Sequence, residues 1–231
     1  MNNIKIKNAK SQLTASITTD TNEKSFSFWK DENGVYQVSS IADGGITNSG
    51  GNSTQMTITN PHTEGVAHTH ITGDYNCFSN GDIFNFQKGN AARPSLIYSF
   101  AFASDGSAYM LTIVDQAKFK TFMDNHPITN YFTINSQGYA ISAGFKEGTD
   151  LYNEFKSAME QFLSQGVSED DAFAGATAHV LIKYDTGAAL SQQDSNGNFN
   201  SIFVNESISP SSTVQSVPIK TYTRTSECNF Q

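Results

Sequence analysis

The chain has 231 residues, enough for one elaborated domain or a domain with an extension, and too few for a large multidomain machine. Its 14 Lys and Arg residues against 22 Asp and Glu residues give a formal charge of −8, which excludes the basic face that a general nucleic-acid binder needs. Only 37% of the residues are hydrophobic, but 17 Phe and 9 Tyr supply large apolar side chains, so the chain can bury a core.

Targeting signals and cysteines bear on the compartment. No run approaches the roughly 20 apolar residues that cross a bilayer, and the start Met-Asn-Asn-Ile-Lys-Ile-Lys lacks the apolar stretch of a signal peptide. The two cysteines, Cys77 and Cys228, do not make the disulfide framework of a small secreted domain. We therefore expect a cytoplasmic protein without a membrane partner, while export by a specialised system, a longer parent protein and the oligomeric state stay open.

Patterns in the first half of the chain predict a short helix followed by strands. Ala9, Leu13 and Ile17 recur at a spacing of four, which indicates a helix. Asn33-Gly34 and Asp105-Gly106 each stand between short apolar stretches, which is typical of β-hairpins. The predicted segments are a helix from residue 9 that ends before Thr18, hairpin strands at 26–28 and 35–36, a loop over 41–53, a strand over 55–60, and hairpin strands over 95–103 and 107–114.

The second half of the chain predicts three helices and a β-rich tail. Asp115 can cap a helix that stops before His126, and Gly166 follows the clearest helix, whose apolar residues recur every three or four positions. Ser168 can cap the next helix. The predicted segments are helices over 115–125, 149–165 and 168–184, and strands around Asn196-Gly197 and over 214–222. Strands and helices mixed in this order, with no internal repeat, indicate an α+β fold.

The residues that can carry chemistry cluster in one stretch. Three of the five histidines, His62, His68 and His70, lie within nine positions. In an extended segment His68 and His70 would point to the same side, because strand side chains alternate. Ser79 and Asp82 follow at the start of a helix-compatible run. Two imidazoles and one carboxylate with an open position for water are typical of a catalytic zinc site, so we expect Zn²⁺ at His68, His70 and Asp82.

This stretch resembles the JAB1/MPN/Mov34 metalloenzyme (JAMM) family, whose signature is an early Glu, then His-x-His, then seven to ten residues, then Ser-x-x-Asp. After His68-Thr69-His70, the run Phe78-Ser79-Asn80-Gly81-Asp82-Ile83 is similar to the bacterial branch of the family. The resemblance covers roughly residues 9–126 and implies a mixed β-sheet flanked by helices. It predicts a JAMM-like metallopeptidase core over 1–148, with an extension over 149–231, two helices and a β-rich tail, packed on it.

The resemblance also implies an activity, namely hydrolysis of an amide bond in a polypeptide. Zinc held by His68, His70 and Asp82 would lower the pKa of its water and polarise the scissile carbonyl. Glu23 would take the proton and pass it to the leaving amine, and Ser79 would stabilise the oxyanion. In bacteria such domains are associated with the processing of larger polypeptides, including secreted toxins, so we expect a metallopeptidase or isopeptidase of this kind.

The chain departs from the family pattern at one position and leaves a choice at another. Glu23, Glu32 and Glu64 all precede the histidines. Glu32 lies in a predicted hairpin turn and Glu64 lies four residues before His68, so Glu23, which opens a predicted strand, is preferred. Ile71 stands where a Pro often follows the second histidine, which changes the loop but removes no ligand.

Structural interpretations stay open beside the chemical one. The His pair alone could be two strand histidines, and Ser79 with Asp82 alone is an ordinary helix N-terminal box. Cys77 is more simply a small buried hydrophobe and His179 a core histidine. The alternative function is a catalytically inactive JAMM-fold binding or scaffold module, and a third candidate is hydrolysis of a cell-wall peptide. The absence of Cys-x-x-Cys and of Gly-x-x-x-x-Gly-Lys excludes a zinc deaminase and a P-loop NTPase.

Overall fold

The computed structural model describes residues 3–44, 58, 60–209 and 219–225. In these ranges the helices are α1 (Ile4–Thr14), α2 (Asn80–Ala92), α3 (Gln116–Asn125), α4 (Ile128–Tyr131), α5 (Asp150–Ser164) and α6 (Glu169–Lys183). The strands are β1 (Lys24–Lys30), β2 (Tyr36–Val38), β3 (Ala42–Asp43), β4 (Thr63–His70), β5 (Tyr98–Ala103), β6 (Ala108–Ile113), β7 (Ala188–Gln193), β8 (Phe199–Ser201), β9 (Phe203–Ser209) and β10 (Ile219–Thr225).

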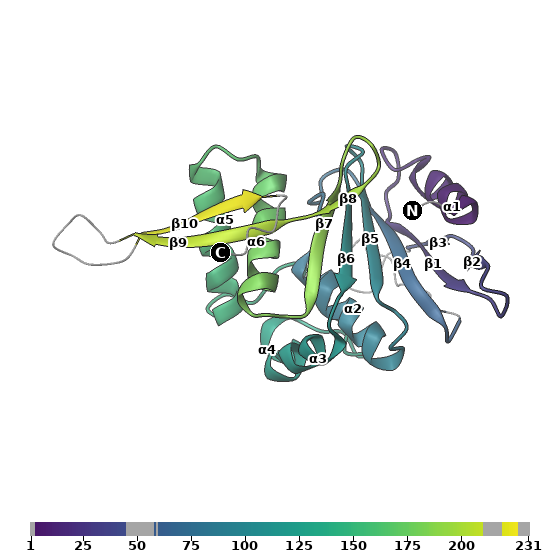
Figure 1. The fold of residues 1–231 in the computed structure, drawn as a ribbon, viewed down its shortest axis with the longest axis horizontal. Coiled ribbons are helices and arrows are strands. Elements are labelled where there is room, and N and C mark those ends of the chain that lie inside the picture. The colour runs from purple at the N-terminus through teal and green to yellow at the C-terminus, as the bar shows by residue number, and fades with distance from the viewer. Residues whose placement is uncertain (1–2, 45–57, 59, 210–218, 226–231) are drawn as a thin grey trace.

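The main sheet has the strand order β2-β1-β4-β5-β6-β7-β8, and β3 pairs with β1 beside this path (Figure 1). β4 and β5 run parallel, whereas the other neighbours in the sheet are antiparallel. Parallel neighbours need a long crossover connection, and α2 lies in the one that joins β4 to β5. The chain therefore has an α+β fold in which helices flank a mixed sheet, as the sequence predicts at this level.

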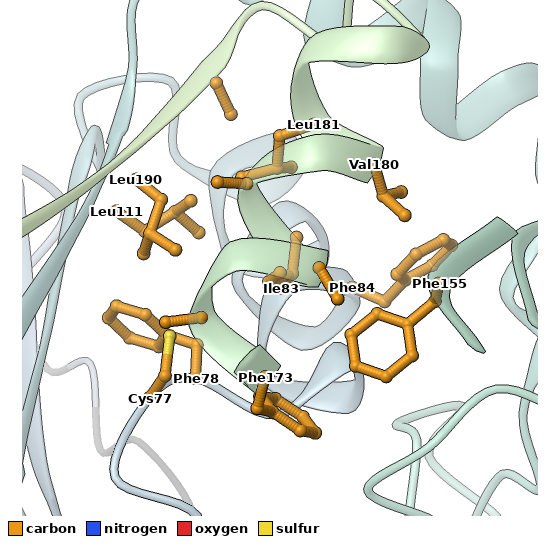
Figure 2. Packing of buried hydrophobic residues seen from close by; sticks show 14 of the residues in the cluster. Cys77, Phe78, Ile83, Phe84, Leu111, Phe155, Phe173, Val180, Leu181 and Leu190 are labelled. Atoms are coloured by element: carbon orange, nitrogen blue, oxygen red, sulfur yellow. The ribbon is translucent and has the colours of Figure 1, made fainter. Parts of the chain in front are cut away.

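The two faces of the main sheet bury different apolar clusters. Alternation along β4 places Val66 in the larger cluster and its neighbour Ala67 in the smaller one. Side chains from α2, α5 and α6 fill the larger cluster, and α1 covers the smaller one. Figure 2 shows Ile83, Leu111 and Leu190 among the side chains of the larger cluster. Residues of β4 that share the orientation of Val66 thus face the side of α2 and α6.

The first predicted helix is confirmed, with earlier bounds. α1 begins at Ile4 because the Asn3 side chain accepts a hydrogen bond from the backbone N–H of Lys5, and it ends at Thr14 rather than just before Thr18. Ala9 and Leu13 are buried against the sheet, as their spacing predicts.

Both hairpins predicted before residue 115 are confirmed. Gly34 and Gly106 close them at φ values of 73° and 91°, a region of the backbone that favours glycine. The predicted loop over 41–53 is wrong for Ala42–Asp43, which pair with β1 as β3. The rest of that loop from residue 45 lies outside the described residues, as do residues 55–57 and 59 of the strand predicted over 55–60.

The helices predicted in the second half are confirmed with their caps. The side chains of Asp115, Thr149 and Ser168 accept backbone N–H bonds at the starts of α3, α5 and α6. The short α4 was not predicted, since four residues are too few for a periodic pattern to show. β7 and β8 form the hairpin around Asn196-Gly197. β10 covers 219–225, and residues 214–218 of the strand predicted over 214–222 lie outside the described residues.

The region after residue 148 is built into the fold of the region before it. β7 pairs with β6 inside the main sheet, and α5 and α6 share the larger apolar cluster with α2. Beyond β8 the chain continues into the β9–β10 hairpin, which lies beside α5 and α6 (Figure 1). The division into a core and an extension stays a prediction. Of the helices that the structure describes, none combines the length and apolarity required to span a membrane.

Candidate metal centre

The C-terminal half of β4 presents two histidines on one face of the sheet. His68 and His70 are each 4% exposed, and their ring centroids lie 4.9 Å apart. Their neighbours across the strands are small, because Ser25 on β1 and Ala101 on β5 flank His68, and Ala103 on β5 pairs with His70. The small neighbours leave room for both rings above the sheet, on the side of α2.

The N-terminus of α2 supplies a carboxylate to the same place. The hydroxyl oxygen of Ser79 accepts the backbone N–H of Asp82 at 3.1 Å. In return, Oδ2 of Asp82 accepts the backbone N–H of Ser79 at 2.8 Å and its hydroxyl at 2.7 Å. This reciprocal pattern is a capping box, so the structural interpretation of the Ser-x-x-Asp motif is confirmed. It does not compete with the chemical interpretation, because the same Oδ2 atom faces the histidines.

Three ligand atoms converge in this arrangement. Nε2 of His68 lies 2.9 Å from Nε2 of His70, and Oδ2 of Asp82 lies 3.8 and 3.6 Å from these two atoms. Three atoms at these separations share a point about 2.0 Å from each, which matches Zn–N and Zn–O bonds of about 2.0 to 2.2 Å. The group can therefore hold a metal ion. The Asp82 side chain keeps 31% exposure against 6% and 5% for the histidines, so the group opens toward solvent on the carboxylate side.

The electrostatics of the group favour a positive charge. Burial by itself lowers the pKa of His70, but the hydrogen bond and charge of Asp82, the charge of Glu23 and the Tyr75 carbonyl outweigh burial and raise that pKa to about 9. Burial likewise acts to raise the pKa of Asp82, yet the two histidines hold it well below its ordinary value. The Nε2 atoms of His68 and His70 cannot both present lone pairs to each other at 2.9 Å. A proton or a cation must therefore lie between them.

The second ring nitrogens of the two histidines differ in their surroundings. Nδ1 of His70 donates to the backbone carbonyl of Tyr75 at 2.5 Å, which leaves Nε2 free to act as a ligand. Nδ1 of His68 is buried and has no hydrogen-bond partner among the residues that the structure describes. The ring of His68 instead packs against Phe78, with centroids 5.6 Å apart.

Glu23 lies beside the three converging residues. It immediately precedes β1, where Ser25 pairs with His68, so continuing the register by two residues brings Glu23 opposite His70. Lys24 is the first residue of β1, and its backbone N–H donates to Oγ1 of Thr69 at 2.9 Å. This hydrogen bond anchors this end of the strand. The charge of the half-buried Glu23 carboxylate acts on His70.

The other two glutamates lie elsewhere. Glu32 is exposed in the turn between β1 and β2. Glu64 is the second residue of β4, at the end of the strand remote from His70, and its carboxylate lies 3.4 Å from the ammonium of Lys30. Of the three candidate glutamates, Glu23 is the one that lies beside the histidines.

Tyr75 takes part in the site, although its residue type does not indicate such a role. Its contribution is a backbone carbonyl, which every residue possesses, so no side-chain pattern could have revealed it. The turn that returns this carbonyl to His70 contains Gly73, at a φ of 101°, and closes with the N–H of Asp74 donating to the carbonyl of Ile71 at 3.1 Å. The one available signal was the Gly in the loop after the second histidine.

A second set of potential ligands surrounds His179. Nε2 of His179 lies 2.7 Å from Oε1 of Glu154 and 4.0 Å from Oε2 of Glu206. The ammonium of Lys183 lies 2.8 and 3.5 Å from the same two carboxylates. Because Lys183 already supplies a positive charge to both carboxylates, this group is an internal ion-pair network, and His179 is a partnered core residue as expected.

The remaining candidates are structural. His62 is an exposed loop residue whose backbone N–H donates to the Asn60 side chain. Cys77 is fully buried in the larger apolar cluster, and burial raises the pKa of its thiol, so it is a small hydrophobe and not a nucleophile.

Comparisons of the chain with protein-family models, with curated proteins and with solved structures found no match. The centre consists of two buried imidazoles, one partly exposed carboxylate and a neighbouring glutamate, which β4, α2 and the start of β1 bring together.

Proposed function

We propose that this protein is a zinc-dependent metallopeptidase or isopeptidase of the JAMM type, which hydrolyses an amide bond in a polypeptide. The observation that carries the proposal is the convergence of the two imidazole Nε2 atoms of His68 and His70 with Oδ2 of Asp82, with Glu23 acting on the same group. Two ordinary strand histidines and an ordinary helix cap would have no reason to meet within 4 Å.

Three residues would hold the ion in this proposal. His68, His70 and Asp82 would bind zinc, which supplies Lewis acidity toward a carbonyl and lowers the pKa of a water molecule. The donor set suits this metal, because neutral imidazole nitrogens and a carboxylate oxygen with one side open are typical of hydrolytic zinc centres. The partly exposed Asp82 side chain lies on the side from which a substrate carbonyl could approach.

Glu23 is the proposed acid and base. As the water oxygen bonds to the carbonyl carbon, Glu23 accepts the water proton, and it then delivers that proton to the amine as the C–N bond breaks. The position of Glu23 opposite His70, at the end of a strand and not within a flexible turn, supports this role. Neither Glu32 nor Glu64 lies where it could exchange a proton with the same water.

Ser79 was expected to stabilise the oxyanion. Its hydroxyl donates to Oδ2 of Asp82, so a hydrogen bond from Ser79 to an oxyanion would require the hydroxyl to rotate away from the carboxylate. The geometry better supports a role in orienting Asp82, and the oxyanion role stays a prediction.

The proposal is tested by metal content and hydrolysis measured together. The wild-type protein, purified without added metal, is expected to hold about one zinc per chain by elemental analysis, and H68A/H70A none. H62A is the matched control, because it removes an exposed histidine from the same stretch and should retain the zinc. Zinc-dependent cleavage is then sought with peptide and isopeptide substrates. Wild-type protein that takes up no zinc even when zinc is offered would overturn the proposal and favour the binding or scaffold module.

A further inference from the structure

The loop between β4 and α2 brings residues distant in sequence to the metal centre. Its carbonyl at Tyr75 accepts the Nδ1–H of His70, and a ligating histidine is held in one tautomer and one ring orientation by such a bond. Within the described ranges Nδ1 of His68 has no equivalent partner, so His70 is the histidine whose orientation depends on the loop. What fixes the Tyr75 carbonyl therefore matters for the geometry of the centre.

The loop is fixed by the first turn of α6, almost a hundred positions further along the chain. The backbone N–H of Asn76 donates to Oδ1 of Asp170 at 3.1 Å, and the Asn76 side-chain amide donates to Oδ2 at 3.0 Å. The carboxylate of Asp170 thus holds Asn76 with both oxygens. The same amide also donates to Asp105, after β5, at 2.8 Å.

The neighbouring residue of the loop is held by the same helix. The ring of Tyr75 stacks on Phe173 with centroids 4.1 Å apart and planes at 22°. Its hydroxyl donates to Oε1 of Glu169 at 3.0 Å. The peptide unit whose carbonyl faces His70 is therefore clamped on both sides, by the Tyr75 ring and by the Asn76 backbone N–H.

We propose that the first turn of α6, chiefly Asp170 through Asn76 and the Tyr75 carbonyl, positions His70 as a metal ligand. Asp170 is a positioning residue, since it reaches the centre only through the loop. This inference rests on the proposed function, because it treats His70 as a ligand of the metal. It also gives the region after residue 148 a part in the centre, although none of the three proposed ligands comes from that region.

The test compares single alanine variants of the full chain. D170A removes the two carboxylate oxygens through which Asp170 accepts from Asn76, and N76A removes the side-chain amide that donates to Asp170. Both variants are therefore expected to weaken zinc binding about 10- to 100-fold in a chelator competition. The double variant D170A/N76A should lose less affinity than the product of the two single losses, because the two residues act partly through the same contacts.

D171A is the matched control. Asp171 occupies the same turn with the same charge, but it bonds to Ser168 and Arg224 and not to the loop. This variant should unfold at a lower temperature and bind zinc with wild-type affinity. Equal losses of affinity in D170A and D171A would overturn the inference, because a general loosening of α6 would then explain them. Unchanged affinity in D170A would overturn it as well.

A metal-free measurement separates this inference from the proposed function. In the wild-type protein kept in chelator, the Nδ1–H proton of His70 should give a slowly exchanging imidazole resonance in the NMR spectrum. That resonance is expected to disappear in D170A and to persist in D171A. If wild-type protein binds no zinc, the proposed function fails and this resonance decides whether α6 holds His70. A resonance that is unchanged in D170A would refute the positioning role whether or not zinc binds.

Discussion

The hydroxyl of Ser79 lies 2.7 Å from Oδ2 of Asp82, the same carboxylate oxygen that lies 3.6 Å from Nε2 of His70. One atom therefore closes the N-terminus of α2 and faces the candidate metal position. Because the cap fixes the carboxylate relative to the helix, and the helix packs on the sheet, the cap also fixes the carboxylate relative to the histidines.

This relationship predicts that S79A loses more than a helix cap. We expect a fall in the free energy of unfolding of about 1 kcal/mol, the usual cost of removing a cap, and zinc binding weaker by about 10- to 100-fold. T149A removes the corresponding cap from α5 and should lower stability by a similar amount without changing zinc affinity. Chemical denaturation and chelator competition measure the two effects. Wild-type zinc affinity in S79A would show that Asp82 needs no support from the cap.

The proposed proton transfer predicts a separation of metal binding from hydrolysis at Glu23. E23Q keeps the size of the side chain but cannot accept a proton, so we expect hydrolysis to fall by at least about 100-fold while zinc content stays at the wild-type level. E32Q is the control, since Glu32 is exposed in the turn after β1 and should be dispensable. Turnover and elemental analysis are measured on the same preparations. Unimpaired hydrolysis by E23Q would remove Glu23 from the mechanism.

The charge balance of the centre predicts how the stability of the metal-free protein depends on pH. The pKa of His70 is raised to about 9 in the folded protein, against about 6.5 for an ordinary histidine, so folding takes up a proton between these values. The stabilisation is complete below about pH 6.5 and is lost as the pH rises through about 9. The pKa of Asp82 is lowered, so its contribution is present above its ordinary value and is lost at lower pH.

Thermal unfolding in chelator between pH 6 and 10 measures this dependence. Wild-type protein should lose stability between about pH 6.5 and 9, and H70A should lose less. H62A should follow the wild-type curve, because it removes an exposed loop histidine that is not one of the three converging residues. Parallel curves for wild type and H70A would contradict the prediction.

The ion-pair network around His179 predicts the zinc stoichiometry. Lys183 already lies 2.8 Å from Glu154 and 3.5 Å from Glu206, so a divalent cation would have to displace an ammonium group and meet its repulsion. We therefore expect about one zinc per chain and not two. H179Q should retain that zinc, in contrast to H68A/H70A. Two equivalents in wild-type protein, with one of them lost in H179Q, would show that the second group also binds metal.

Several features follow from residues that are close in the chain. The caps at Asp115, Thr149 and Ser168 and the glycine turns at Gly34 and Gly106 lie where the sequence predicts them, because each depends on the backbone angles and hydrogen bonds of a few adjacent residues. The shared orientation of His68 and His70 is of the same kind, since alternation along a strand decides it. The pairing of Ser79 with Asp82 is a local contact over three residues.

Contacts between distant segments could not be read in this way. The sequence favours Glu23, but its nearness to His70 depends on which end of β4 faces the start of β1. The insertion of β7 beside β6 depends on strand pairing across about 80 residues. The contact of Asn76 with Asp170 has no local signature, because each side chain is an ordinary polar residue on its own. Such contacts arise when packed elements bring together groups that the chain separates, so their geometry belongs to the packing of the whole fold and not to any one segment.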